Sequence, residues 1–465
     1  MRSDLAVLGS GPGGYIAAIR AAQLGLSVSV IEADRPGGVC LNWGCIPSKA
    51  LLTGAELVEN LRSHGETFGI GVSGLTLDYD KLITHSRKTA DRLAKGVEGL
   101  LKKNGVTLVR GRGRFAGAGV LEVSGAEPQL VEAASVIVAT GSREFVPPGL
   151  VVDGTRVLTS REALESRVVP PRLVVIGAGA VGLEFAYVYA MYGAQVTIVE
   201  MADQVLPGCD PDVAEAMQRE LRRKKIEVRL GTRFEGCKVA NGGVRVTVSK
   251  GQTGETSELE AEQLLVAIGR RPLSDDLGLE KVGLSPDARG FLAVDAQLRT
   301  AVPNVYAIGD VAQPPLLAHK ASEEGIAAVE TIAGVRRPPL DHRKIPACIY
   351  AQPQVAWIGL TEAQAKAEYG DDVLVGKFPF TASGKAVAAA HTAGFVKIIA
   401  EPRYKEIVGA HLIGAGATEL VAEIGLAMTL EATTGEIAAT CHAHPTLSEA
   451  ILEAALAAEG RGLNF

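Results

Sequence analysis

The chain has 465 residues, which is too many for one hydrophobic core, so we expect several domains. Its formal charge of −6 offers no basic stripe and argues against nucleic acid as a partner. With 54 glycines and 5% aromatic residues, the composition is typical of an α/β protein with many tight turns. Six cysteines do not form a disulfide framework at this length, and no Cys-x2-Cys or His-x3-His spacing indicates a metal site.

The N-terminus, residues 1–4, passes directly into a predicted strand and carries no signal peptide or transit segment. We therefore expect a cytoplasmic protein, in a reducing compartment where a disulfide is more often catalytic than structural. The most apolar run, residues 173–199, contains several glycines and Glu184. It divides into strand, turn, helix and strand, so we expect no membrane span there.

The first motif in chain order is a dinucleotide-binding pattern. Residues 4–8 are predicted to be a strand, 15–24 a helix and 26–31 a second strand that ends at Glu32. Between them lies a GxGxxG turn, in which the three glycines turn the chain, admit a pyrophosphate and allow close packing of helix and strand. The carboxylate can accept hydrogen bonds from ribose hydroxyls. A glycine-rich turn without function is the alternative. The turn reads Gly9, Ser10, Gly11, Pro12, Gly13, Gly14.

Two cysteines five positions apart, Cys40 and Cys45, come after that pattern. Gly44 allows a tight turn before the second cysteine, and Pro47 fits an early helical position, so a helix is predicted to begin here. A helix N-terminus favours the thiolate, and a neighbouring thiol pair can cycle between dithiol and disulfide. Two buried cysteines that are merely neighbours, or a structural bridge, are the alternatives.

The next stretch is mainly helical over residues 51–110 and then forms strands. The strand at 135–142 ends in a glycine turn with Thr140 and Gly141, and Pro147 and Pro148 mark a domain boundary.

A second dinucleotide-binding pattern comes next, with strands at 172–176 and 195–199 and a helix at 183–192. Its acid, Glu200, lies 23 residues after the first glycine, as Glu32 does in the first pattern, which indicates an internal duplication. A carboxylate here pairs with a free 2′-hydroxyl and repels a 2′-phosphate, so NAD(H) is favoured over NADP(H). The turn reads Gly177, Ala178, Gly179, Ala180, Val181, Gly182.

Residues 304–310 form a predicted strand that delivers Asp310 to a loop, where a carboxylate could hold the polyol of a flavin. Beyond residue 344, strands alternate with helices, and the last helix is predicted over 446–459. His444 precedes Pro445 at the entrance of this helix, and Glu449 can reach back to its ring. Such a pair is a general base with an orienting carboxylate. A helix-entry histidine beside a surface acid is the alternative.

Together these motifs resemble the flavin-dependent pyridine nucleotide–disulfide oxidoreductases, and within them the branch that oxidises protein-bound dihydrolipoyl-lysine. The resemblance implies an α/β fold with two Rossmann-like domains, for FAD and NAD, a central domain and a C-terminal α+β dimerisation domain. The implied boundaries are 1–146, 147–272, 273–343 and 344–465. The segments that carry the resemblance are 9–14, 38–49, 138–141, 177–184, 266–270, 307–310, 317–320 and 442–449.

The resemblance also implies a role for each site residue. Cys40 and Cys45 form the redox disulfide, in which Cys40 meets substrate and Cys45 contacts the flavin. Lys49 lies near the flavin ring with Glu184 as its ion-pair partner, although two solvated charges are the alternative. The implied FAD contacts are Gly9, Gly11, Pro12, Gly13, Gly14, Glu32, Lys49, Gly113, Thr140, Gly141, Asp310 and Ala318. The implied NAD contacts are Gly177, Gly179, Ala180, Val181, Gly182, Glu200, Phe234 and Gly269.

In this family the histidine of one subunit serves the disulfide of the other, so the resemblance implies a homodimer with His444 and Glu449 as its acid–base pair. The implied partners are the lipoyl and subunit-binding domains of a dihydrolipoamide acyltransferase, in 2-oxo acid dehydrogenase or glycine-cleavage complexes. Electrons would pass through the disulfide and FAD to NAD+. Trp43 departs from the family pattern, because many relatives carry a smaller residue between the cysteines.

Other members of the family would need features that this sequence lacks. Glutathione and trypanothione reductases would need basic residues in place of Glu200, and mercuric and large thioredoxin reductases a second thiol pair near the C-terminus. Soluble transhydrogenases lack the full cysteine pair. An FAD-binding scaffold subunit without catalysis is the alternative from a different class.

Overall fold

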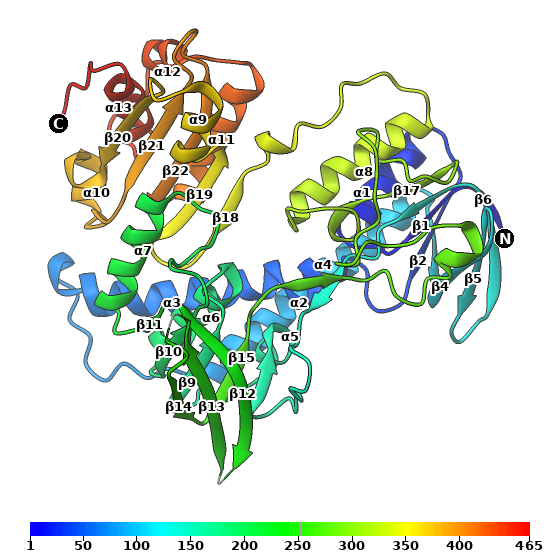
Figure 1. Ribbon diagram of the computed structural model, residues 1–465, viewed down its shortest axis with the longest axis horizontal. Helices are drawn as coiled ribbons and strands as arrows, with labels where there is room; N and C mark the ends of the chain where they lie inside the picture. Colours follow the sequence, from blue (N-terminus) through cyan, green and yellow to red (C-terminus); the bar gives the residue numbers. More distant parts are fainter. Residues whose placement is uncertain (241, 252) are drawn as a thin grey trace. The chain divides into compact units, whose positions relative to one another are not determined.

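A computed structural model describes residues 1–465 except 241 and 252, and it confirms the expected α/β class (Figure 1). The chain divides into two compact units. Unit 1 comprises residues 1–50, 81–145 and 269–340. Unit 2 comprises residues 51–80, 146–268 and 341–465.

Unit 1 is built on a sheet in which five strands run parallel in the order β3-β2-β1-β6-β17. Two antiparallel strands, β5 and β4, extend it from the first half of β6. The central strand is buried on both faces, as its apolar run Leu5–Leu8 predicts. The strands are β1 (Arg2–Leu8), β2 (Val28–Glu32), β3 (Thr107–Arg110), β4 (Arg112–Gly117), β5 (Val120–Ser124), β6 (Gln129–Val138) and β17 (Val305–Ala307), with the hairpin β7 (Ser142–Glu144) and β16 (Arg270–Pro272).

The helix of the first dinucleotide-binding pattern, α1 (Pro12–Gln23), packs beside α8 (Ala318–Ile332) (Figure 1). A Cβ atom on Gly325 would lie 2.6 Å from the carbonyl oxygen of Gly13, so the contact requires glycine. Helix α1 begins earlier than the predicted residue 15, because the fixed φ of Pro12 suits the first helical position. The other elements are α2 (Gly38–Trp43), η2 (Leu279–Val282) and η3 (Gly309–Val311), and unit 1 also holds the first part of α3 (Cys45–His64) and most of α4 (Tyr79–Lys103).

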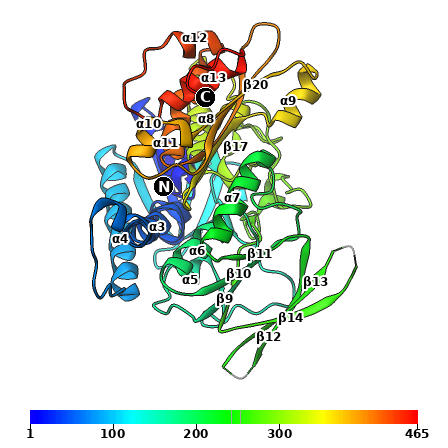
Figure 2. The same ribbon diagram turned by 90° about the vertical axis from the view of Figure 1, so that its left-hand side faces the viewer.

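Unit 2 contains a second parallel sheet, β11-β10-β9-β15-β8, whose first four strands repeat the order β3-β2-β1-β6, as expected for an internal duplication. The fifth strand differs, because β8 comes before the others in the chain whereas β17 comes after them. An antiparallel ribbon, β12-β13-β14, extends from this region (Figure 2). The elements are β8 (Val157–Thr159), α5 (Ser160–Ala163), β9 (Arg172–Ile176), α6 (Ala180–Met191), β10 (Gln195–Val199), α7 (Pro211–Arg223), β11 (Glu227–Arg229), β12 (Thr232–Ala240), β13 (Gly243–Lys250), β14 (Thr256–Ala261) and β15 (Gln263–Val266), together with η1 (Glu66–Phe68) from the α3–α4 connection.

The C-terminal part of unit 2 is an antiparallel sheet, β18-β19-β22-β21-β20, packed against α11 and α13 (Figure 1). The final helix begins at Glu449 instead of the predicted residue 446, because the Thr446 hydroxyl donates to the Ala443 carbonyl and holds a turn. The elements are η4 (His342–Lys344), β18 (Ala347–Ile349), β19 (Gln354–Gly359), α9 (Glu362–Tyr369), β20 (Leu374–Pro379), η5 (Phe380–Ala382), α10 (Gly384–Ala388), β21 (Phe395–Ala400), β22 (Ile407–Gly414), α11 (Ala417–Thr429), α12 (Thr434–Ala439) and α13 (Glu449–Ala458).

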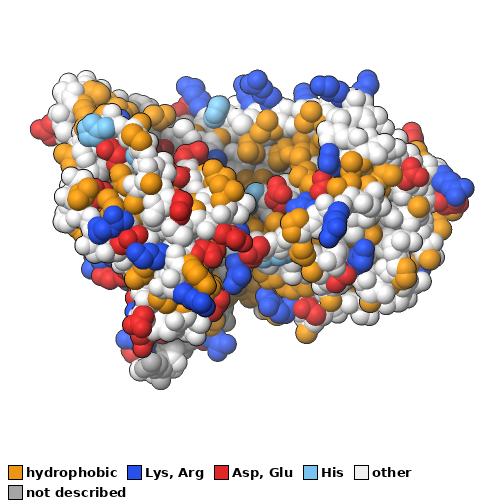
Figure 3. Space-filling view, turned by 90° about the horizontal axis from the view of Figure 1, so that it is seen from above, with side chains coloured by type: hydrophobic (Ala, Val, Ile, Leu, Met, Phe, Trp, Pro, Cys, Tyr) orange, Lys and Arg blue, Asp and Glu red, His pale blue; other side chains and the backbone are white. Residues whose placement is uncertain are grey.

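Across the residues that the structure describes, we find no helix with the length and apolar character of a membrane span. Charged side chains of both signs are spread over the face seen in Figure 3.

Candidate active site

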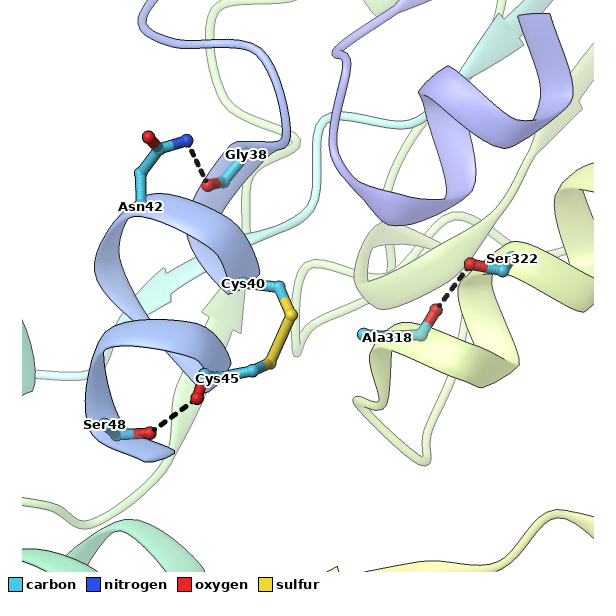
Figure 4. Close-up of a disulfide and its surroundings, with 7 residues drawn as sticks. All are labelled: Gly38, Cys40, Asn42, Cys45, Ser48, Ala318 and Ser322. Atoms are coloured by element: carbon cyan, nitrogen blue, oxygen red, sulfur yellow. Dashed lines mark hydrogen bonds between the residues drawn. A yellow bond between two sulfur atoms is a disulfide. The ribbon is translucent and has the colours of Figure 1, made fainter. Parts of the chain in front are cut away.

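The two cysteines of the predicted redox pair form a disulfide in unit 1 (Figure 4). Cys40 lies in α2 and Cys45 is the first residue of α3, with 4.7 Å between their Cα atoms. Gly44 ends α2 and lets the chain turn into α3. The predicted helix N-terminus is therefore present at Cys45, where the helix dipole favours a thiolate once the bridge is reduced. In Figure 4 the sulfur atoms face the side on which Ala318 begins α8.

Hydrogen bonds hold the turn that carries this disulfide. The buried amide of Asn42 donates to the carbonyl oxygens of Pro36 and Gly38, at 3.0 and 2.9 Å. Two residues of α4 bind the same turn from outside: Arg87 donates to the Asn42 carbonyl at 2.7 Å, and Ser86 donates to the Pro47 carbonyl at 2.8 Å. The disulfide thus lies on a rigid support, which a thiol exchange site requires.

Trp43, the residue that departs from the family pattern, has a clear place in this support. Its indole N–H donates to the Asp34 carboxylate at 3.0 Å, and the Arg87 guanidinium lies 4.5 Å from its ring centroid. The tryptophan therefore ties α2 both to α4 and to the segment just after Glu32.

The first glycine turn has the shape that a pyrophosphate needs. A Cβ atom on Gly9 would meet the Ala139 carbonyl oxygen at 2.4 Å, and one on Gly14 would meet the Gly9 carbonyl oxygen at 2.0 Å. A Cβ on Gly11 would meet nothing within 4 Å, and Gly11 caps α1 without a side-chain hydrogen bond. The open space above the N–H groups of α1 fits the pyrophosphate of FAD.

The acids predicted around FAD are held by neighbouring donors. Glu32 is 9% exposed, and it accepts hydrogen bonds from the Ser10 N–H at 2.8 Å, the Ser10 hydroxyl at 2.6 Å and the Asp34 N–H at 2.8 Å. Asp310 comes after β17, as predicted, and accepts from the Ser142 hydroxyl at 2.5 Å. Both carboxylates therefore have fixed orientations before any ligand binds.

The other predicted FAD residues have different local roles. The Thr140 hydroxyl donates to the Leu273 carbonyl at 2.6 Å, and Gly141 has a positive φ. Gly113 is required by packing, because a Cβ atom would lie 2.5 Å from the Leu8 side chain. Ala318 is the first residue of α8, whose N-cap makes no side-chain hydrogen bond.

Lys49 lies on the part of α3 that belongs to unit 1, whereas Glu184 lies on α6 in unit 2. Glu184 is 6% exposed and accepts from the Tyr350 N–H at 3.0 Å. The ion pair between Lys49 and Glu184 stays a prediction.

The second glycine turn repeats the first. A Cβ atom on Gly177 would meet the Ala267 carbonyl oxygen at 2.3 Å, one on Gly182 would meet the Gly177 carbonyl oxygen at 1.9 Å, and one on Gly179 would meet nothing within 4 Å. Glu200 accepts from the N–H groups of Ala178 and Ala202, at 2.7 and 2.8 Å. These residues fit the pyrophosphate and ribose of NAD.

The remaining predicted NAD residues lie in both units: Gly269 is in unit 1, and the others are in unit 2. Ala180 and Val181 begin α6, and Gly269 has a φ of 121°. Phe234 on β12 is partly buried against the core of the second sheet. Its contact with NAD stays a prediction.

The predicted acid–base pair is present in unit 2. His444 Nδ1 lies 2.8 Å from Glu449 Oε1, and Glu449 Oε2 accepts from the Thr446 N–H at 2.8 Å. The Thr446 N–H and then the His444 ring lower the pKa of Glu449 below its ordinary value. A carboxylate only accepts, so Nδ1 donates to Glu449 and Nε2 lies outside this bond. The His444 side chain is 77% exposed.

Two sets of contacts near the predicted site residues were not predicted from the sequence. The Trp43–Asp34–Arg87 contacts join segments far apart in the chain, and the sequence offered only the unusual tryptophan as a signal. His442, two residues before His444, is bonded to Glu423 on α11 at 2.8 Å. The repeated histidine in His-Ala-His-Pro was its only signal.

Comparisons with known proteins agree with this geometry. Residues 3–325 match the family described as pyridine nucleotide-disulphide oxidoreductase, and residues 345–455 match its dimerisation domain. The dihydrolipoyl dehydrogenase of Zymomonas mobilis is 44% identical over 99% of both chains, and that of Chlorobaculum tepidum is 45% identical over 97% of this chain and 96% of its own. The crystal structure of LpdA from Mycobacterium tuberculosis has a TM-score of 0.91 at 28% identity, over 98% of this chain and 99% of its own. The chain belongs to the pyridine nucleotide-disulphide oxidoreductase family, whose enzymes use FAD and NAD.

Proposed function

We propose that this chain is a dihydrolipoyl dehydrogenase, which oxidises protein-bound dihydrolipoyl-lysine to lipoyl-lysine and reduces NAD+. The observation that carries the proposal is the Cys40–Cys45 disulfide at the start of α3, in a chain whose full-length relatives bear that name. The carboxylate of Glu200 at the second glycine turn supports NAD over NADP.

The thiol step needs a base, a nucleophile and a leaving sulfur. His444 of one subunit, oriented by Glu449, takes a proton from a dihydrolipoyl thiol. The resulting thiolate attacks Cys40 and breaks the Cys40–Cys45 bond, and Cys45 leaves as a thiolate at the N-terminus of α3. The second lipoyl thiol then displaces Cys40 and closes the lipoyl ring, and its proton passes to the Cys40 sulfur, so lipoyl is oxidised by two electrons and the cysteine pair is reduced by two.

A bound FAD would supply the two-electron carrier between the reduced cysteine pair and NAD+. The turn from Gly9 to Gly14, with Glu32, Asp310, Ala318 and the Lys49–Glu184 pair, would hold and orient FAD. The turn from Gly177 to Gly182, with Glu200, would hold NAD. The rigid support under the disulfide keeps the sulfurs in one place for both exchange steps.

The wider setting of the reaction belongs to the same proposal. The domains are those implied by the resemblance: FAD-binding to residue 146, NAD-binding to 272, central to 343 and interface to 465. The match of residues 345–455 to a dimerisation domain supports a homodimer, in which each disulfide receives its base from the other subunit. The partners are the lipoyl and subunit-binding domains of a dihydrolipoamide acyltransferase. A cytoplasmic location fits the four cysteines that remain thiols, Cys209, Cys237, Cys348 and Cys441.

A substrate panel tests the proposal. The purified flavoprotein is assayed with dihydrolipoamide, glutathione, thioredoxin and mercuric ion, each with NAD(H) and NADP(H). We expect turnover with dihydrolipoamide and NAD+. Faster turnover of another substrate, or a preference for NADP(H), would contradict the proposal. No turnover with lipoamide and NADH would favour the scaffold role.

A further inference from the structure

The motif that carries the proposed base contains two histidines with opposite environments. The His444 side chain is 77% exposed, whereas the His442 side chain is 4% exposed. Both are paired with a glutamate at 2.8 Å, so pairing alone does not distinguish them.

The hydrogen bonds of His442 exclude it as a base. Its Nδ1 lies 2.9 Å from the carbonyl oxygen of Thr440, and its Nε2 lies 2.8 Å from Glu423 Oε1. A carbonyl and a carboxylate can only accept hydrogen bonds, so both ring nitrogens of His442 face acceptors of this chain and the ring is held between them. Neither nitrogen of this buried ring is open to a thiol.

The bond between His442 and Glu423 lies close to His444 in the chain, so it can fix the segment that carries His444. Residues 440–448, here called the histidine segment, lie between the end of α12 at Ala439 and the start of α13 at Glu449, and they form neither helix nor strand. His442 ties the first half of the segment to α11 through Glu423. The bond from the Thr446 N–H to Glu449 ties the second half to α13. His444 lies between these two anchors.

We propose that His442, through its hydrogen bond to Glu423, is a positioning residue for His444. The pair fixes the histidine segment so that the exposed imidazole is presented to the disulfide of the other subunit in one orientation. This inference rests on the proposed function. A displacement of about 1 Å at a reacting group can lower a rate by about 10²-fold, so loss of one anchor is expected to affect thiol exchange strongly.

The test compares two reductants of the same bound flavin in the dimeric holoenzyme. Flavin reduction by dihydrolipoamide requires His444, whereas flavin reduction by NADH does not. For His442→Leu we expect the first rate to fall by about 10- to 100-fold, and the second to stay within about twofold of wild type. A protein that was merely destabilised would lose flavin or dimer and would lower both rates. Glu419→Gln, one turn earlier on α11, is the matched control and should change neither rate.

Two further variants make the test independent of folding problems. His442→Gln keeps one of the two donors and should lose about three- to tenfold in the dihydrolipoamide rate alone. The double variant His442→Leu/Glu423→Leu should be no slower than His442→Leu, because the two residues act as one unit. Wild-type dihydrolipoamide rates in His442→Leu, or in His442→Gln if the former does not fold, would overturn the inference. Failure of the proposed function would appear differently, as wild-type flavin that dihydrolipoamide does not reduce.

Discussion

The two strand–turn–helix–strand patterns, β1-α1-β2 and β9-α6-β10, have almost the same geometry. In each, the acid accepts from the N–H of the residue after the first glycine, at 2.8 Å for Glu32 and 2.7 Å for Glu200. In each, the second glycine, Gly11 or Gly179, is the one whose Cβ would meet open space. The glycine turn is therefore a fixed framework, and the chemistry of each copy depends on the residues that come after its βαβ pattern.

Both copies place a cysteine two residues before a proline in the first turn of a later helix, α3 in the first copy and α7 in the second. Cys45 begins α3 and is bonded to Cys40. Cys209 lies just before α7 and is 4% exposed, and burial together with the Asp210 charge raises its pKa to about 12. A helix N-terminus alone does not produce a reactive thiol. A second sulfur within reach distinguishes the first copy, whereas burial beside a carboxylate makes the second inert.

Serine substitution at each thiol gives the largest expected effect and tests this contrast directly. Cys40→Ser removes the sulfur that we propose forms the mixed disulfide, so dihydrolipoamide turnover should fall by at least about 10³-fold while FAD stays bound. Cys209→Ser is the matched control and should retain nearly full turnover. Steady-state rates measure the turnover of both variants, and the flavin absorbance measures whether FAD stays bound. Normal activity of Cys40→Ser would remove that residue from the mechanism.

Asp210 has a second role, because it binds a buried lysine. Lys397 on β21 is 2% exposed and lies 3.0 Å from Asp210, 3.1 Å from Asp212 and 2.7 Å from Glu362. Lys397→Met leaves the buried Asp210 carboxylate, and the partly exposed carboxylates of Asp212 and Glu362, without this cation, so the free energy of unfolding should fall by about 3 kcal/mol. Lys377→Met, at a lysine 45% exposed beside Asp212, should cost less than about 1 kcal/mol. Denaturant unfolding of the holoenzyme measures both, and equal losses would contradict the role of burial.

The same cluster gives a sign for the pH dependence of stability. Hydrogen bonds from Lys366 and Lys397 lower the pKa of Glu362, and Lys397 lowers that of Asp212 although burial opposes it. Groups with a lowered folded-state pKa stabilise the protein above their unfolded pKa, and this contribution is lost as the pH falls through the folded values. Acid should therefore destabilise wild type more than Lys397→Met. If the stability of wild type and of Lys397→Met fell equally as the pH is lowered, this role of the lysine cluster would be contradicted.

The equivalence of the two turns is tested by adding one methyl group to each. Gly179→Ala fills the open space above α6, so the KM for NAD+ should rise by about 10- to 100-fold, the equivalent of an overpacking cost of ~1–3 kcal/mol, while FAD stays bound. Gly11→Ala should weaken FAD retention instead. Flavin content and NAD+ kinetics of both variants separate the two sites. Loss of FAD from Gly179→Ala would reverse the assignment of the copies.

The smallest expected effect concerns nucleotide choice. Glu200→Gln removes the negative charge and leaves the backbone donors of Ala178 and Ala202 with a weaker acceptor. The preference for NAD+ over NADP+ should narrow by about tenfold, as expected for hydrogen bonds to a charged group. The ratio of kcat/KM for the two nucleotides measures this. An unchanged ratio would mean that another residue selects the nucleotide.

The sequence predicted the parts of this molecule that local patterns determine. The two glycine turns, the cysteine pair and the His444–Glu449 bond each span a short stretch whose spacing reflects helix and turn geometry. Contacts between distant segments were not predictable in this way. Lys397 and Asp210 are 187 residues apart, and a single lysine in an apolar strand was the only local signal. His442 was missed because its partner lies on α11, and sequence spacing alone does not show which of two histidines is buried.

The two parallel sheets also differ in how the chain supplies their strands, with a consequence for biosynthesis. The sheet of unit 2 is complete once residue 266 has been made, whereas the sheet of unit 1 still lacks β17, which begins at Val305, and its helix α8, which ends at Ile332. On the ribosome, the parallel sheet of unit 2 is therefore the first of the two to have every strand available. The parallel sheet of unit 1 keeps an open edge beside β6 until β17 has been synthesised, when more than half of the polypeptide has emerged.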